Sequence, residues 1–94
     1  MVKEHINSIV ARINTTGKIC AITAKSIFDT AERLRKGESI TPQSLLKSDA
    51  FFDIRVKVNR LVIDSDDFHP TTMEMDCALF QHANYVLGLA SYAL

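Results

Sequence analysis

The chain has 94 residues, of which 47% are hydrophobic and 23% charged, and its eleven basic side chains are balanced by eleven acidic ones. This size and composition are those of one ordinary globular domain and exclude a fibrous or intrinsically disordered chain. The zero net charge excludes an overall electrostatic attraction to nucleic acid or an anionic membrane. The charges are uneven, however, because residues 1–39 have seven basic and four acidic side chains, whereas residues 65–94 have four acidic and no basic ones.

The two ends of the chain lack the patterns of export and membrane insertion. Glu4, His5 and Asn7 interrupt the apolar run that a secretory signal would need. The segment from Cys77 to Leu94 has no formally charged side chain, but it contains polar amides and no basic residue flanks it, unlike a membrane span. We therefore expect a cytoplasmic protein without membrane contact.

The first segment has apolar side chains at intervals of three and four residues, which predicts an amphipathic helix over about 3–36. Residues 14–17 (Asn-Thr-Thr-Gly) are poor helix formers, so a kink or break near Gly17 is the alternative. We favour one continuous helix, in which the small residues Gly17, Ala21 and Ala24 let another helix approach closely.

Three cations and a glycine mark the end of this helix. Arg33, Arg35 and Lys36 lie where positive charge complements the helix dipole. Gly37 can adopt the left-handed conformation that ends many helices. The helix is therefore predicted to stop at Lys36 or Gly37.

A second helix is predicted over about 42–63. Thr41 supplies a capping oxygen, and Pro42 suits the first helical position. Ser48 followed by Asp49 has the pattern of a second cap. We therefore expect a bend near Ser48.

Residues 51–63 (FFDIRVKVNRLVI) also alternate apolar and polar side chains, as a strand does. No other segment offers a good partner strand, and Asn59-Arg60 lacks the glycine of a tight hairpin turn. As a helix, the same residues place Phe51, Ile54 and Val58 on one side. We predict a helix here and keep the strand as the alternative.

The last helix is predicted over about 72–93. Thr71 and Glu74 have the spacing of a capping box, in which each side chain accepts a hydrogen bond from the other residue's backbone. One broad face is predicted to be core. Its two stripes consist of Cys77, Phe80, Ala83, Leu87, Ala90 and Leu94, and of Met75, Leu79, Val86 and Ala93.

The opposite face of this helix is aromatic where a charged face would be ordinary. Beginning at Ala78, it continues through His82, Tyr85, Leu89 and Tyr92. Exposed apolar patches are unusual in monomers, and Tyr is favoured at protein contacts. The alternative is that neighbouring helices cover this helix on all sides. We predict that His82, Tyr85, Leu89 and Tyr92 bind a protein partner.

Side chains suited to metal binding or catalysis are few and scattered. The acidic loop 64–67 lacks the glycine and glutamate of an EF-hand, and His69, Cys77 and His82 do not have zinc-finger spacing. Cys77 with a histidine is the one conceivable pair of nucleophile and base. We predict no metal, no cofactor and no enzyme activity, and we expect Cys20 and Cys77 to be reduced and buried.

Basic side chains support a second hypothesis, a small nucleic-acid-binding regulator that uses the basic side of residues 33–60. These side chains are Arg33, Arg35, Lys36, Lys47, Arg55, Lys57 and Arg60. Asp49 and Asp53 fall within the segment that would contact the nucleic acid. We therefore favour solvated helix faces over this hypothesis.

The sequence thus predicts a single all-α domain over residues 1–94, a small antiparallel bundle of three main helices at about 3–36, 42–63 and 72–93. The favoured function is non-enzymatic protein binding, by self-association as a homodimer, by binding and modulating another protein, or both. Small adaptors and inhibitors encoded by phage or mobile elements share this size, which is an analogy only.

Overall fold

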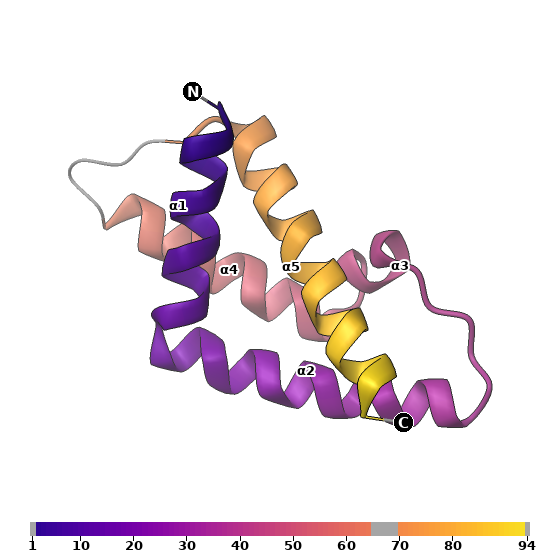
Figure 1. The fold of residues 1–94 in the computed structure, drawn as a ribbon. Helices are drawn as coiled ribbons and strands as arrows, with labels where there is room; N and C mark the ends of the chain where they lie inside the picture. The colour runs from indigo at the N-terminus through magenta and orange to yellow at the C-terminus, as the bar shows by residue number, and fades with distance from the viewer. Residues whose placement is uncertain (1, 65–69, 94) are drawn as a thin grey trace.

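In the computed structural model, the backbone is described for residues 2–64 and 70–93, and the side chains of these residues except 2–6 and 50. The described residues form five α-helices and no β-strand (Figure 1). The helices are α1 (Val2–Thr15), α2 (Gly17–Arg35), α3 (Pro42–Leu46), α4 (Asp49–Ile63) and α5 (Thr72–Tyr92). The predicted all-α fold is confirmed.

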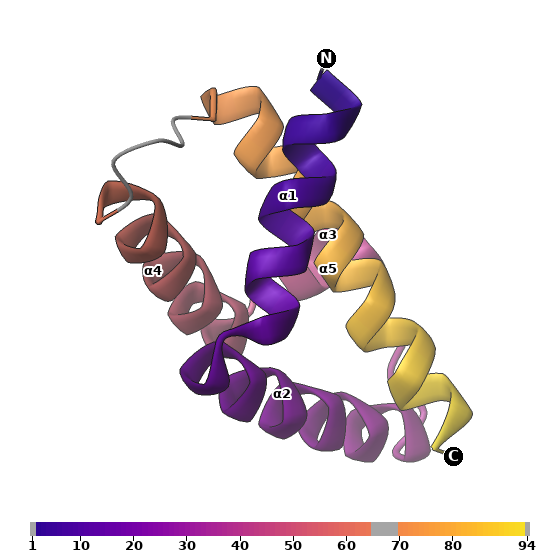
Figure 2. The same ribbon diagram turned by 60° about the vertical axis from the view of Figure 1, so that its left-hand side comes forward.

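Helix α5 is the central element, because α1, α2 and α3 all pack against it. It begins beside the N-terminal half of α1 and ends beside the C-terminal end of α2 (Figures 1 and 2). Helix α4 packs mainly on α2 and lies at the edge of the molecule in Figure 2. The core draws apolar side chains from all five helices, with the largest group on α4 and α5.

The continuous first helix that we favoured is wrong, because the chain breaks at Thr16 between α1 and α2. Thr16 has an extended backbone conformation, with φ of −83° and ψ of 116°. The hydroxyls of Thr15 and Thr16 donate to the carbonyls of Ala11 and Arg12, at 3.0 and 2.8 Å. Such side-chain bonds compete with regular helix geometry, and α1 and α2 meet at a sharp bend (Figure 1). The alternative of a break near Gly17 is confirmed.

The predicted end of this segment is confirmed. Gly37 has a φ of +88°, in the left-handed region. Its N–H donates to the Leu34 carbonyl, and the Glu38 N–H donates to the Arg33 carbonyl. These two bonds form a Schellman motif, which satisfies carbonyls at the end of α2.

The start signals in the middle of the chain are also confirmed. Thr41 and Ser44 exchange capping hydrogen bonds at the start of α3. The Ser48 hydroxyl accepts from the Phe51 N–H at the start of α4, so the predicted bend near Ser48 separates two helices. Residues 51–63 are helical, and the strand alternative is wrong.

Helix α5 confirms its predicted bounds and its capping box. Thr71 Oγ1 accepts from the Glu74 N–H at 3.2 Å, and Glu74 Oε1 accepts from the Thr71 N–H at 2.9 Å. Within the described residues, no helix has both the length and the hydrophobicity needed to cross a bilayer.

Two glycines give opposite predictions for stability. We expect Gly37→Ala to destabilise the protein by about 1 kcal/mol, because a Cβ is strained at a positive φ. Gly88 is exposed within α5, and a Cβ there would meet nothing within 4 Å. Gly88→Ala should therefore stabilise the protein by about 0.5–1 kcal/mol. Urea unfolding followed by circular dichroism measures both changes, and equal effects of the two substitutions would contradict this account.

Candidate protein-interaction site

The buried face of α5 differs from the predicted one by a rotation around the helix axis. The neighbouring helices bury Met75, Leu79 and Val86, as expected, but they also bury Ala78 and His82. In the predicted core stripe, Ala83 and Ala90 are buried, Phe80 and Leu87 are only partly buried, and Cys77 is exposed. The second stripe was therefore the better guide to the core.

His82 is the predicted contact residue whose position the structure corrects. Its side chain is only 2% exposed, so it does not belong to the outer surface of α5. His82 Nε2 lies 2.9 Å from Thr23 Oγ1 on α2, and the ring lies 5.8 Å from the ring of Phe51 on α4. The imidazole therefore joins three helices in the interior.

Burial fixes the charge state of His82 at neutral pH. Desolvation disfavours the imidazolium and lowers the pKa of His82 from 6.5 to about 4. A neutral ring has one donor and one acceptor nitrogen, which suits the single hydroxyl partner at Nε2. His82 thus acts as an uncharged core residue.

The other three predicted contact residues remain on the surface. Tyr85 is 50% exposed, Leu89 39% and Tyr92 93%. They follow one another at helical spacing on the same side of α5. We call these three residues the α5 surface. The Tyr85 ring stacks on His82 at 5.9 Å, with 23° between the ring planes, so the buried imidazole supports one side of this surface.

A shallow hollow of about 220 Å³ adjoins Tyr85 at the bend between α1 and α2. Its other lining residues are Ile13, Asn14, Cys20, Thr23, Ala24 and Ile27. Phe28, one turn after Ala24 on α2, is 75% exposed. Nothing in the periodicity of α5 indicated these α1 and α2 residues, because only the bend at Thr16 brings them beside Tyr85.

Both cysteines differ from the prediction of burial. Cys20 and Cys77 are exposed and not paired in a disulfide. Cys77 lies outside whereas His82 lies inside, so these two do not meet as nucleophile and base. Among the residues the structure describes, no three His, Cys, Asp or Glu side chains could together hold a metal ion. The acidic residues 66 and 67 and His69 lie outside the described residues.

The seven basic residues of the nucleic-acid hypothesis do not form one stripe. The C-terminal ends of α2 and α4 lie at opposite sides of the molecule (Figures 1 and 2). Arg33 pairs with Glu38 at 3.0 Å, and Arg35 donates to the Ala93 carbonyl at 3.2 Å. The other basic side chains are exposed at separate positions: Lys36 caps the end of α2, Lys47 lies in the turn between α3 and α4, and Lys57 and Arg60 lie on α4. The hypothesis remains a prediction that the geometry does not favour.

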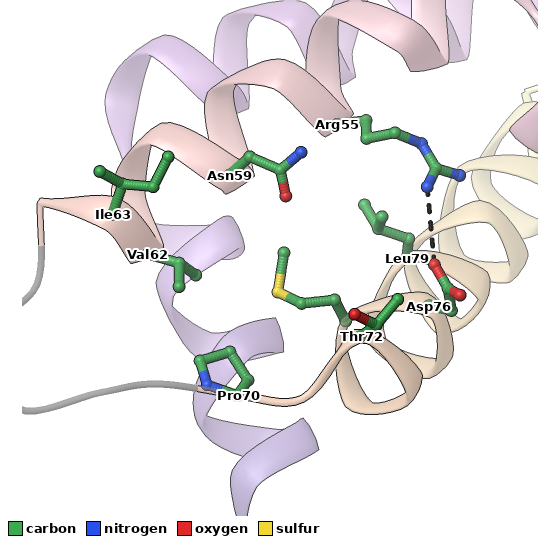
Figure 3. Close-up of a pocket in the computed structure, with 9 residues that line it drawn as sticks. Arg55, Asn59, Val62, Ile63, Pro70, Thr72, Asp76 and Leu79 are labelled. Carbon is green, nitrogen blue, oxygen red and sulfur yellow. Dashed lines mark ion pairs between the residues drawn. The ribbon is translucent and has the colours of Figure 1, made fainter.

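A pocket of about 420 Å³ lies between α4 and α5 (Figure 3). Arg55 and Asp76 form an ion pair at 3.5 Å across its edge, and Asn59 extends from α4. The rest of the lining consists of Val62, Ile63, Pro70, Thr72, Met75 and Leu79. This ion pair links two helices, so sequence spacing could not have predicted it.

No known family model, curated protein or solved structure matches this chain.

The buried His82 predicts a loss of stability in mild acid. Because the unfolded imidazole binds a proton near pH 6.5 and the folded one only near pH 4, the free energy of unfolding should fall as pH drops below about 6.5. The fall is about 1.4 kcal/mol per pH unit, and about 3 kcal/mol by pH 4. Above pH 6.5 the buried, neutral His82 makes its full contribution to the free energy of unfolding.

Urea unfolding of the wild type and of His82→Gln over this pH range measures the effect. The glutamine cannot be protonated and can still bond to Thr23, so its stability should change less between pH 6.5 and 5. Identical pH profiles would show that burial of His82 does not shift its titration.

Proposed function

We propose that this protein is a non-enzymatic helical interaction module of the small adaptor or inhibitor type, which binds a protein through the α5 surface. The bound protein is a second copy of the chain, a different protein whose activity is modulated, or both in turn. The observation that supports the proposal most is the exposure of Tyr85, Leu89 and Tyr92 on one side of α5.

The chemistry of this surface suits a protein partner. From Cys77 to Tyr92, α5 has no formally charged side chain. The hollow beside Tyr85 extends the surface onto α2, where Ala24 and Ile27 contribute apolar area and Phe28 is exposed nearby. Aromatic side chains next to a shallow apolar depression are typical of the centres of protein interfaces.

The environments of the reactive side chains support a non-enzymatic role. His82 is buried, neutral and bonded to Thr23, whereas the Cys77 thiol lies on the outside of α5. Cys20 and Cys77 are exposed and unpaired, as thiols usually are in a reducing compartment, and we propose a cytoplasmic location on this basis.

Substitution of Leu89 tests the proposal. Leu89→Asp places a charge in the middle of the α5 surface without entering the core, since Leu89 is 39% exposed. Each apolar side chain that is buried on binding contributes about 1.5–3 kcal/mol, so we expect a loss of affinity of roughly 10- to 100-fold. Light scattering measures the effect on self-association, and capture from a cell lysate by the immobilised protein measures the effect on another partner.

Asn84→Asp is the matched control, because it adds the same charge to an exposed position of α5 that lies about a third of a turn around the helix from the α5 surface. It should leave both measurements unchanged. If Leu89→Asp and Asn84→Asp behave like the wild type in both, the α5 surface does not bind a protein and the proposal fails.

A further inference from the structure

Helix α4 has a second apolar surface that points away from the core. Phe52 is 61% exposed, Val56 47% and Ile63 75%. With Asn59, these residues repeat at intervals of four, three and four along the helix. This is the spacing of a coiled-coil contact line, in which apolar side chains recur every 3.5 residues on average. We call these four residues the α4 stripe.

Within the described part of the chain, no side chain buries the α4 stripe, although Asn59 and Ile63 also line the pocket between α4 and α5. The buried side chains of α4 are Phe51, Ile54 and Val58, on the opposite side of the helix, where α2 and α3 pack. In Figure 2, α4 forms one edge of the molecule. Three large apolar side chains in a row on such an edge are a candidate interface.

Charges beside the stripe indicate which occupant fits. By helical periodicity, Asp53 and Arg60 lie along one flank of the stripe and Arg55 along the other. Asp53 and Arg60 are exposed, and in the described residues neither forms an ion pair within the chain. The flank with Asp53 and Arg60 is therefore acidic toward the start of α4 and basic toward its end.

An antiparallel second copy matches this charge order. A twofold axis between Val56 and Asn59 pairs Phe52 with Ile63 of the second copy, and Val56 with Asn59 of the second copy. The same axis brings equivalent flanks together, so Asp53 faces Arg60 of the second copy, and the reverse pair forms by symmetry. The two residues of each pair differ in height by two residues, or about 3 Å, which side chains of this length span easily.

A parallel pair would be opposed by like charges. In parallel coils, one flank of a helix meets the other flank of its partner five residues further on. Arg55, which already pairs with Asp76 of its own chain, would then face Arg60 of the second copy, twice in the dimer, and Asp53 would have no basic partner across the interface. The order of charges therefore selects the antiparallel arrangement over the parallel one.

We propose that the α4 stripe pairs with the α4 stripe of a second copy in an antiparallel, twofold-symmetric dimer held by Phe52, Val56 and Ile63 and oriented by Asp53 and Arg60. The inference rests on the proposed function for the capture of a different protein by the α5 surface, and it assigns self-association to α4 instead. With this assignment, Leu89→Asp should weaken capture of the different protein and leave the dimer unchanged. An interface of one helix per subunit belongs to the small class, so the dimer should form in a concentration-dependent way.

Charge reversal tests the pairing directly. The solution mass is measured by light scattering at protein concentrations up to about 1 mM. A dissociation constant above about 1 mM would mean that the association is too weak to matter. Asp53→Arg alone and Arg60→Asp alone each place like charges together twice per dimer and should raise the dissociation constant about tenfold or more. The double variant Asp53→Arg/Arg60→Asp restores opposite charges and should return to within about threefold of the wild type.

Two further variants separate this inference from the proposed function. Val56→Asp should abolish the dimer and keep the circular dichroism of the folded protein, whereas Leu89→Asp should leave the dimer intact. A wild type that is monomeric at every concentration overturns the inference, and so does a dimer that is lost with Leu89→Asp but not with Val56→Asp. Single charge reversals without effect overturn it as well. None of these results affects capture of another protein by the α5 surface, which Leu89→Asp tests separately.

Discussion

The bend at Thr16 is the constraint on which the rest of this fold depends. Helix α5 has apolar side chains around most of its circumference, and one straight helix can cover only a single strip of it. Because the chain bends, α1 covers the first half of α5 and α2 covers the second half (Figures 1 and 2). Thr23 on α2 reaches His82, and Arg35 at the end of α2 reaches the Ala93 carbonyl. Two helices with different directions thus bury more of the apolar surface of α5 than one straight helix could.

The two exposed apolar surfaces follow from the same shortage of covering helices. A domain of this size buries only about 60% of the surface that its unfolded chain exposes. Helices α1, α2 and α3 are used to cover α5, and α4 in turn covers α2, which leaves the outer sides of α4 and α5 without a neighbour in the described residues. Apolar side chains at Phe52 and Leu89 then remain in solvent. A monomer gains little stability from these exposed side chains, and this is the physical argument that supports both proposals of a partner.

Local signals in the sequence predicted the ends of the helices, and long-range contacts decided what the sequence could not show. Thr41, Ser48 and Thr71 cap helices through bonds to residues three positions away, so spacing was enough to find them. The burial of His82 depends on Thr23, 59 residues earlier, and no periodicity on α5 contains that information. The alternating pattern of residues 51–58 suggested a strand because apolar residues occupy two opposite sides of α4. One of these sides is core and the other is the α4 stripe.

The contact between His82 and Tyr85 connects the interior to the α5 surface. Tyr92 is 93% exposed and has no ring contact in the described residues, so the proposed binding would restrict its rotamers at a cost. Tyr85 is half-buried and stacks on an imidazole that is held by Thr23 and lies near Phe51. Less conformational freedom is left for Tyr85 to lose on binding. In the proposed interface, Tyr85 and the neighbouring Leu89 are therefore the ordered centre and Tyr92 is the rim. The hydrogen bond between His82 and Thr23 thus contributes to the stability of the fold and also fixes the geometry of the exposed Tyr85 ring.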